Sequence, residues 1–369
     1  MRGSLTPELA ACGFKVAESC HREYGLLLGS GTAALALACR MAPTERKKII
    51  VPAIACAHVL FAVIYAECRP VFVDICAETG LLDPNLVRIA LEKDPEIGAV
   101  LVVHTYGHVA DLHSIANHAR ANGALVIEDA AQAQGGAYAD NRPVGAIGDL
   151  ALVSFGHTKI LDTGGGGVLM TDCHDMYEAC LELAGELPPP PADLEDRLAD
   201  YRSRYYLEWN KRARDPMALH RIGMLHRYYR EIFLYRGVEA VSRRIMDALA
   251  SLPLNVSTRL ALASEYTTQL AGSRRVRLCE PAPGSVPWRF VFRVPAAERD
   301  ALVECLRRAS VDVSSWYPSL AYFYANGKTC ATLPNADIFT QEVVNLWVTP
   351  GYDRKKIHVA CALIRDYLG

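Results

Sequence analysis

Short apolar runs alternate with helical patterns along the first half of the chain. Runs rich in Val, Ile and Leu have the length and composition of buried strands, and the segments between them repeat apolar residues at helical spacing. We expect strands at residues 26–28, 49–51, 71–74, 99–104, 124–127, 150–155 and 168–171. After a helical lead-in, we expect helices at 32–41, 56–67, 84–93 and 112–122. This order predicts a mostly parallel sheet with helices on both faces, an α/β fold.

The last third of the chain predicts a smaller unit. Residues 237–272 have a long helical periodicity, which we expect to bridge two domains. An α+β module follows, with strands at 289–294 and 311–314 and helices at 297–308 and 355–368. We therefore divide the chain into a large domain, residues 1–236, and a small C-terminal domain, residues 237–369.

A proline-rich, aromatic and basic segment, residues 187–236, ends the large domain. It contains ten Lys or Arg residues against seven Asp or Glu residues. Two interpretations are open. The segment is either a cover over the active site that recognises an anionic substrate, or an amphipathic helical hairpin whose charges face solvent. Runs of charge are usually solvated, which favours the hairpin.

The composition suits a large globular protein better than a nucleic-acid or membrane protein. With 369 residues, 51% of them hydrophobic, and a net charge of −2, the chain can bury a large core and lacks the basic charge of nucleic-acid binders. The longest apolar stretch, residues 49–68, is interrupted by Pro52, His58 and Glu67, so a strand and a core helix explain it better than a membrane span. The start of the chain has no apolar signal core.

The cysteines and histidines do not indicate a metal site. The twelve cysteines stand singly, without C-x-x-C or zinc spacing, as expected of buried small residues in a reducing cytoplasm. His104 and His108 have the spacing of a metal-binding pair, but Gly107 opposes the helix that this spacing requires. Tyr106 or His108 is instead a candidate for lining a substrate cavity. Farther along, Trp316 and Tyr317 are candidates for either the active site or core packing.

Candidate chemistry gathers between residues 124 and 172. Asp129 falls at the carboxyl end of a predicted strand, where ligands bind in parallel α/β sheets. Lys159 follows the next strand, and four glycines, residues 164–167, follow the lysine. Upstream, Gly31 and Thr32 lie at a predicted helix N-terminus, which favours an anion. Each feature alone also suits an ordinary cap or a solvated charge, and their combination is what indicates a site.

Three motifs in this stretch resemble those of one enzyme family. They read VIEDAAQAQG (126–135), VGAIGDLALVSFGHTK (144–159) and GGGGVLMTD (164–172). They resemble the DegT/DnrJ/EryC1/StrS aminotransferases, the fold-type-I pyridoxal-phosphate enzymes often called sugar aminotransferases. The resemblance continues through residues 29–37, 51–75 and 102–116, thins downstream, and returns from residue 289. It implies a three-layer large domain whose last strand runs antiparallel, a smaller α+β domain, and a homodimer with the active site at its interface.

The resemblance also implies a pyridoxal 5′-phosphate site. Lys159 would be the catalytic Schiff-base lysine, Asp129 would bind the pyridine nitrogen, and Gln132 would lie beside the ring hydroxyl. The phosphate ligands would be Thr32, the Gly31 backbone and Ser154. The chemistry agrees, because a carboxylate at the pyridine nitrogen keeps the ring protonated, and a pyridinium is the electron sink that makes a carbanion at Cα accessible. Lys159 can also serve as a general base.

Three positions depart from the family's pattern. Cys56 stands in the cofactor site where many members carry an aromatic residue that stacks on the ring. Gly165 replaces the glutamate of G-E-G-G, and Leu234 replaces the asparagine of the N-Y-R motif that the partner subunit contributes. Two of the three positions border the sugar pocket in the family. The departures therefore count against an ordinary nucleotide-linked keto sugar as the acceptor.

Three functions are compatible with these residues. The first is an aminotransferase that moves an amino group from an amino acid, glutamate in our expectation, to a keto sugar or another carbonyl intermediate of a biosynthetic pathway. The second is a lyase or a carbon–carbon bond-forming enzyme, because fold and cofactor do not fix the fate of the carbanion. The third is a binding protein with a vestigial site, which the intact Asp129, Gln132, Ser154 and Lys159 oppose. We expect the first.

Overall fold

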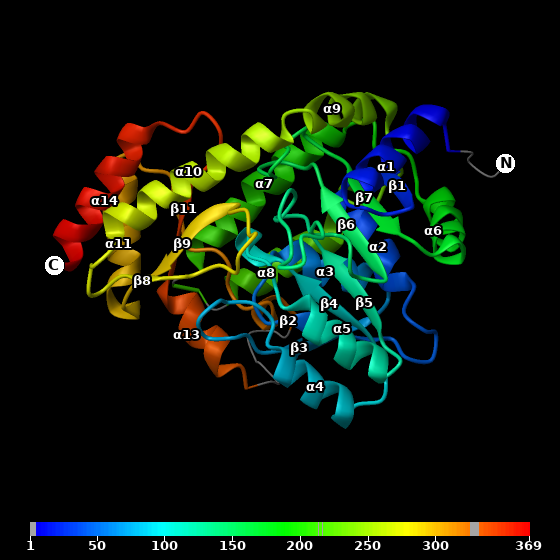
Figure 1. Ribbon diagram of the computed structural model, residues 1–369, viewed down its shortest axis with the longest axis horizontal. Helices are drawn as coiled ribbons and strands as arrows, with labels where there is room; N and C mark the ends of the chain where they lie inside the picture. The colour runs from blue at the N-terminus through cyan, green and yellow to red at the C-terminus, as the bar shows by residue number, and fades with distance from the viewer. Residues whose placement is uncertain (1–4, 213, 216, 325–331) are drawn as a thin grey trace.

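The computed structural model describes residues 5–212, 214–215, 217–324 and 332–369. Its strands form two sheets, one of seven strands and one of four, each covered by helices (Figure 1). The large sheet belongs to the N-terminal part of the chain and the small sheet to the C-terminal part. Within the described ranges, no helix has both the length and the apolar character needed to cross a membrane.

The large sheet has the strand order β1-β7-β6-β5-β4-β2-β3. Its strands are β1 (Tyr24–Leu28), β2 (Lys48–Pro52), β3 (Arg69–Val73), β4 (Ile97–Val103), β5 (Leu125–Asp129), β6 (Leu150–Ser154) and β7 (Gly167–Thr171). Neighbours from β3 to β6 pair in parallel, whereas β7 is antiparallel to both β6 and β1. The expected mostly parallel sheet and its reversed last strand are confirmed. Because β4, β5 and β6 run in one direction, their carboxyl ends meet at one edge of the sheet.

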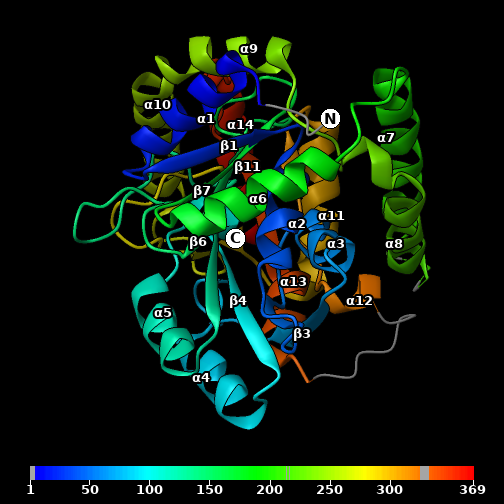
Figure 2. The ribbon, with the colours of Figure 1, turned by 90° about the vertical axis from the view of Figure 1, so that its right-hand side faces the viewer.

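Helices on both faces of this sheet make three layers. One face carries α2 (Gly31–Arg40), α3 (Ala57–Tyr65) and α6 (His174–Glu186), and the other carries α1 (Pro7–Ser19), α4 (Pro84–Lys93) and α5 (Leu112–Ala121). Figure 2 shows α4 and α5 on one side of β4 and α2 and α3 on the other. Leu101 and Val103 of β4 join the first core, and Val100 and Val102 join the second. Burial on both faces explains why the strands are continuous apolar runs.

The small sheet is antiparallel and has the order β10-β11-β9-β8. Its strands are β8 (Arg277–Leu278), β9 (Arg289–Arg293), β10 (Val313–Ser314) and β11 (Val343–Trp347). α11 (Ala296–Arg308) and α14 (Arg354–Leu368) pack on it around Phe292, Leu302 and Ile364. The expected α+β module is present. β11 was not expected, because α13 (Pro334–Glu342) passes directly into it without a turn signal.

Two helices connect the sheets. Val241 and Ile245 of α9 (Glu239–Leu249) pack into the large-sheet core, and Leu262 and Tyr266 of α10 (Leu252–Leu270) pack into the small-sheet core. Figure 1 shows α10 running from α9 toward α14. This arrangement agrees with the bridge expected over residues 237–272. The division into residues 1–236 and 237–369 stays our proposal.

Residues 187–236 contain the expected helical hairpin. Its arms are α7 (Leu194–Lys211) and α8 (Ala218–Tyr228), which Figure 2 shows beside α3. Phe61 of α3 stacks on His226 of α8 with ring centroids 3.7 Å apart. Aromatic side chains such as Trp209 are buried on the inner side, whereas Arg204 pairs with Asp200 on the outer side.

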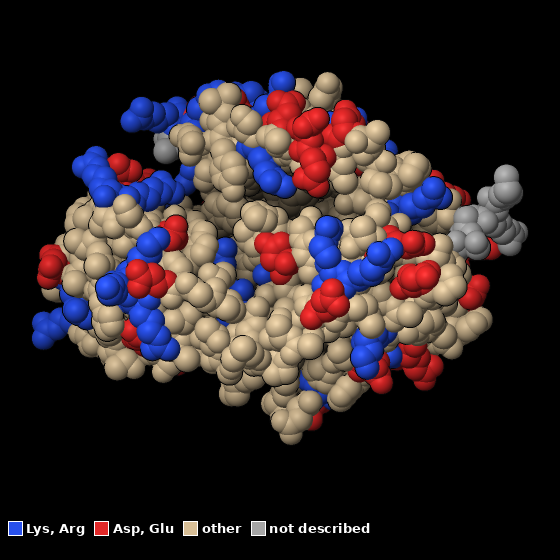
Figure 3. Space-filling view, turned by 90° about the horizontal axis from the view of Figure 1, so that it is seen from above, with Lys and Arg blue, Asp and Glu red and all other residues tan. Residues whose placement is uncertain are grey.

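The surface carries charges of both signs. On the face shown in Figure 3, Lys and Arg are interspersed with Asp and Glu. Oppositely charged side chains also form ion pairs, for example Lys48 with Asp94 and Arg88 with Glu92. A surface of this kind has no extended field of one sign over that face.

Candidate active site

A cavity of about 300 Å³ lies at the carboxyl ends of β5 and β6. Its wall includes every residue that the sequence predicted for the site, namely Gly31, Thr32, Cys56, Asp129, Gln132, Ser154 and Lys159. Other parts of the wall come from the hairpin, including Tyr201, Arg202 and Tyr205, and from the C-terminal unit, namely Trp288, Trp316 and Tyr317. The fold thus brings the predicted residues together from separate segments of the chain.

Asp129 ends β5 and is 4% exposed. One of its carboxylate oxygens accepts the Ala131 N–H at 2.9 Å, and no Lys, Arg or His side chain in the described ranges forms an ion pair with it. Burial raises the pKa of this carboxyl group, and the positive charge of Lys159 opposes the rise. A cation in the cavity would stabilise the carboxylate, and a protonated ring nitrogen meets that requirement.

Lys159 lies in a tight loop between β6 and β7. The Phe155 N–H donates to the Gly166 carbonyl at 3.0 Å, and the Thr163 N–H donates to the Phe155 carbonyl at 2.9 Å, so the loop is closed on itself. Lys159 lines the cavity, and its amine forms no ion pair with a carboxylate of the described residues. The loop therefore presents an amine to the cavity without a competing partner.

The N-terminus of α2 forms another part of the wall. Ser30 caps the helix by accepting the Ala33 N–H at 3.0 Å. A Cβ on Gly31 would lie 2.7 Å from Ser154 Oγ, so only glycine lets this hydroxyl approach the helix end so closely. First-turn N–H groups lack intrahelical acceptors, and with a neighbouring hydroxyl they form a good anion site. A phosphate group fits this arrangement.

Glu128 fixes the end of β5 from behind. Its carboxylate is fully buried. It accepts hydrogen bonds from the N–H groups of Gly145, Ile147 and Gly148, the Tyr138 hydroxyl and the His104 ring. Burial disfavours the charged form, yet the hydrogen bond and charge of His104, together with the other donors, lower the pKa of Glu128 to about 2. The charged carboxylate therefore holds residues 145–148 against the strand that carries Asp129.

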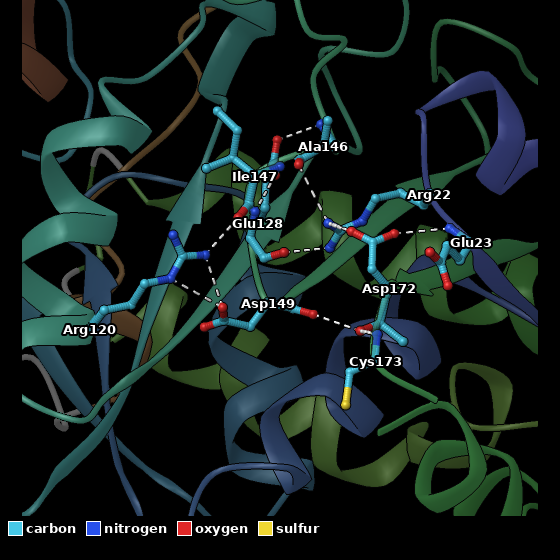
Figure 4. A network of polar contacts seen from close by, with 12 residues as sticks. Arg22, Glu23, Arg120, Glu128, Ala146, Ile147, Asp149, Asp172 and Cys173 are labelled. Atoms are coloured by element: carbon cyan, nitrogen blue, oxygen red, sulfur yellow. Dashed lines mark hydrogen bonds and ion pairs between the residues drawn. The ribbon is translucent and has the colours of Figure 1, made fainter. Parts of the chain in front are cut away.

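Two arginines bind carbonyl groups of the same loop from either side, Arg22 those of Ala146 and Gly148, and Arg120 that of Ile147 (Figure 4). The Arg22 side chain is 4% exposed and pairs with Asp172 at 2.7 Å. Arg120 pairs with Asp149 at 2.9 Å, and the second Asp149 oxygen accepts the Val126 N–H of β5 at 2.8 Å. These arginines also line an open hollow of about 750 Å³ at the opposite edge of the sheet from the cavity. Their charges are already paired there, so we assign this region a structural role.

Gln132 is bound at both ends of its carboxamide. Its oxygen accepts the Tyr106 N–H at 2.9 Å, and its nitrogen donates to the Tyr317 hydroxyl at 3.1 Å. Tyr106 and His108, 0% and 3% exposed, lie behind the wall, which corrects the expectation that one of them lines the cavity. The turn after β4 is the reason, because Tyr106 adopts φ 66° there and its hydroxyl donates to the Trp316 carbonyl. Trp316 and Tyr317 line the cavity instead.

The histidines after β4 are not arranged as ligands. His104 contacts Glu128 at 3.3 Å, and Nδ1 of the buried His108 has no partner among the described residues. Burial lowers the pKa of His108 to about 4, so this ring is neutral near pH 7. In the parts of the chain that the structure describes, no three His, Cys, Asp or Glu side chains gather as a metal site would require.

His58 is a site residue that sequence reasoning missed. It lies at the start of α3, with Nδ1 3.3 Å from Thr32 Oγ1. Burial, reinforced by the positive charge of Lys159, lowers its pKa to about 4. Its ring meets those of His226 and Phe233 edge-on, with centroids 4.6 and 4.7 Å apart. The only sequence signal was a single histidine in an apolar helix, which is equally typical of a core residue.

The hairpin covers the site with its aromatic face. The Tyr201 hydroxyl lies 3.0 Å from His226 Nε2, which ties α7 to α8 at the cavity. Cys56 lines the cavity beside Tyr201 and Tyr205. Burial raises the pKa of the Cys56 thiol, and the charge of Lys159 opposes the rise. The described part of residues 187–236 therefore forms a hairpin that pairs charges on its outer side and lines the cavity with Tyr201, Arg202 and Tyr205.

Comparison with known proteins identifies one family over nearly the whole chain. Residues 6–365 match the DegT/DnrJ/EryC1/StrS aminotransferase family. The dTDP-3-amino-3,4,6-trideoxy-alpha-D-glucose transaminase of Streptomyces venezuelae is 29% identical over 98% of this chain and 88% of its own length. The GDP-perosamine synthase of Escherichia coli O157:H7 is 32% identical, and the chain spans about half of its length, 47% of each protein.

The solved structures agree with this assignment. The structure of DesV from S. venezuelae, in complex with a ketimine intermediate, has a TM-score of 0.79 and 26% identity to this chain, and covers 99% of it and 90% of DesV. This similarity and the sheet topology confirm the expected fold class, and aminotransferases of this family depend on pyridoxal phosphate. The chain therefore belongs to the DegT/DnrJ/EryC1/StrS aminotransferase family, as its motifs predicted.

Proposed function

We propose that the cavity binds pyridoxal 5′-phosphate and that the enzyme moves an amino group from glutamate to a keto sugar or a related carbonyl intermediate of a biosynthetic pathway. Family membership makes the chain an aminotransferase, and the roles of individual residues, the donor and the acceptor are what we add. The observation that carries the proposal is that Asp129 and Lys159 line one cavity next to the anion site at Gly31 and Ser154, and that neither forms an ion pair with a described residue.

Each residue has a definite task in this proposal. Asp129 keeps a proton on the ring nitrogen through a charge-assisted hydrogen bond, which contributes roughly 1.5–3 kcal/mol. The start of α2, Thr32 and Ser154 bind the phosphate, and Gln132 lies beside the ring hydroxyl. When bound, the cofactor supplies the electron sink for chemistry at the donor's Cα. Lys159 would act as the general base that takes the proton from the donor's Cα, and positioned proton transfer of this kind typically contributes roughly 10²–10⁴ in rate.

We assign acceptor recognition to the hairpin. Tyr201 and Tyr205 offer ring surface against which an apolar sugar face can pack, and Arg202 offers a guanidinium for an anionic group. The two curated relatives carry dTDP- and GDP-linked sugars in their names, which supports a sugar acceptor. Cys56, smaller than the usual aromatic residue, leaves the hairpin side chains as the aromatic surface of this part of the wall.

We also propose that the enzyme acts as a cytoplasmic homodimer. Leu207, Met224 and Tyr228 on the hairpin are 59%, 57% and 71% exposed. Exposed apolar side chains of this kind on a segment that lines the site suit contact with a second copy of the chain. All cysteines in the described ranges are free thiols, as expected in a reducing compartment.

The decisive experiment is the visible absorbance spectrum of the purified protein with pyridoxal phosphate, before and after addition of glutamate. The wild type should show an absorbance band of cofactor joined to Lys159. Glutamate should convert this band to the band of the aminated cofactor. Lys159→Ala should lack the first band, and Lys15→Ala should behave like the wild type, because Lys15 is exposed and pairs only with Glu18.

Two results would contradict the proposal. A protein that takes up no pyridoxal phosphate would rule out the cofactor site. A lysine-dependent band that no amino donor converts would instead favour a lyase or a carbon–carbon bond-forming reaction on the same scaffold, the second function compatible with the sequence.

A further inference from the structure

Tyr317 belongs to the C-terminal unit but reaches the wall of the cavity. It follows β10, and Asn345 of β11 fixes this loop by accepting the Ser314 hydroxyl at 3.1 Å and the Trp316 N–H at 2.7 Å. Farther along the same loop, the Leu320 N–H donates to the Ala53 carbonyl at 2.8 Å. Contacts to both sheets therefore hold the loop in place.

Tyr317 also sits in a stack of rings. Its ring lies between Trp288 and Tyr106, with centroids 6.1 and 5.7 Å away and interplanar angles of 13° and 19°. The Trp288 indole donates in turn to the Thr158 carbonyl at 2.6 Å, next to Lys159. The stack fixes the direction in which the Tyr317 side chain enters the site, because the ring cannot turn without displacing its neighbours.

A set of hydrogen bonds links Tyr317, Tyr106 and Gln132. The Tyr317 N–H donates to the Tyr106 hydroxyl at 3.0 Å, and that hydroxyl donates to the Trp316 carbonyl at 2.8 Å. The Tyr106 N–H donates to the Gln132 oxygen, and the Gln132 nitrogen donates to the Tyr317 oxygen. The Tyr317 hydroxyl is thus an acceptor in this set, and its own proton has no acceptor among the described residues.

The Tyr317 hydroxyl retains that proton. The side chain is 5% exposed, and burial raises its pKa well above the usual range of a tyrosine. A phenol hydroxyl that already accepts one hydrogen bond can still donate its own proton in another. Because Tyr317 lines the same cavity as Asp129 and Lys159, an oxygen atom of a bound molecule is the partner that this donor lacks.

We propose that Tyr317 is a further hydrogen-bond donor of the active site, which the C-terminal unit contributes and Gln132 orients, and that it binds an oxygen of the cofactor or of the substrate beside Gln132. The proposal rests on the proposed function, because it requires that the cavity bind pyridoxal phosphate. A donor held in place before the ligand arrives stabilises negative charge on that oxygen at little cost in reorganisation.

Tyr317→Phe tests the proposal because phenylalanine keeps the ring stack and removes only the hydroxyl. If the hydroxyl donates to the cofactor's ring oxygen, it favours the form in which that oxygen is fully charged. Loss of the hydroxyl in Tyr317→Phe should then raise the midpoint of the bound cofactor's pH-dependent absorbance change by about one pH unit or more. If the acceptor belongs to the substrate, the midpoint should stay and the half-reaction at saturating glutamate should slow about tenfold or more.

Two control variants separate these effects from loss of packing. Tyr322→Phe removes a hydroxyl of the same C-terminal unit that contacts Asp337 at 3.4 Å and does not line the cavity. Tyr266→Phe removes a buried hydroxyl from α10 in the small-sheet core, outside the cavity wall. Both variants should keep the wild-type midpoint and half-reaction rate.

A Tyr317→Phe protein with an unchanged midpoint and an unchanged half-reaction would overturn the inference while leaving the proposed function intact. Wild-type protein that fails to bind pyridoxal phosphate would contradict the proposed function first. Melting temperatures of all variants with and without pyridoxal phosphate show which proteins are folded, so loss of folding cannot be mistaken for loss of the donor.

Discussion

Glu128→Gln tests whether the buried carboxylate behind Asp129 holds the end of β5 in place. Glutamine keeps the size of the side chain but replaces one acceptor oxygen by an NH₂ group that faces other donors. The folded pKa of Glu128 is about 2, against an ordinary value of 4.5. At 1.36 kcal/mol per pKa unit, that difference corresponds to about 3 kcal/mol of stabilisation at pH 7. We expect the substitution to lower the free energy of unfolding by about that amount.

The assay is urea unfolding followed by tryptophan fluorescence at a series of pH values. Because the folded pKa is the lower one, the contribution of Glu128 is complete above about pH 4.5 and is lost as the pH falls toward 2. The wild type should therefore lose this stability on acidification, and Glu128→Gln should not. Glu92→Gln, an exposed partner of Arg88, should change stability by less than about 1 kcal/mol.

Two results would refute this reasoning. A loss of less than about 1 kcal/mol in Glu128→Gln at pH 7 would mean that the hydrogen bonds to Glu128 barely exceed the cost of burying its charge. Parallel acid curves for the wild type and Glu128→Gln would mean that the charge of Glu128 does not stabilise the fold.

Three further predictions concern the site. Gly31→Ala should weaken pyridoxal-phosphate binding about tenfold or more in a fluorescence titration, because the added Cβ meets Ser154. Gly185→Ala should not weaken binding, because a Cβ there has no neighbour within 4 Å. Equal affinities of the two variants would contradict the anion site. For His58, whose pKa is lowered to about 4 from 6.5, the unfolded chain holds a proton that the folded chain lacks between these values. Stability in urea should thus fall as the pH drops from 6.5 to 4, and less steeply in His58→Asn; an equal slope would exclude His58 as the source. Arg202→Gln should raise KM for an anionic acceptor roughly tenfold and leave the glutamate half-reaction unchanged, while Arg204→Gln, paired with Asp200 on the surface, should alter neither. An unchanged KM in Arg202→Gln would remove Arg202 from acceptor recognition.

The sequence predicted the parts of the site that follow from strand direction. Asp129 and Ser154 end neighbouring parallel strands, so their proximity could be expected once the strands were recognised. Tyr317 was only one of two candidates with an alternative in core packing, and Trp288 was not expected at all, because both belong to the C-terminal unit and reach the cavity only through long-range packing. Tyr106 was misplaced for a related reason, since nothing in its local sequence shows a turn that buries its ring. His58 lacked a distinct signal altogether.

The hairpin enters and leaves the large domain within one continuous stretch, residues 187–236, whereas Asp129, Ser154 and Lys159 stand on the central sheet and its adjoining loop. In the proposed function, bond chemistry and acceptor recognition therefore belong to separate segments of the chain. Replacement of the hairpin by that of a relative would exchange the inner wall supplied by Tyr201 and Tyr205 without touching the strand ends. A scaffold divided in this way can evolve new acceptors by exchange of one segment, while selection preserves the catalytic sheet unchanged.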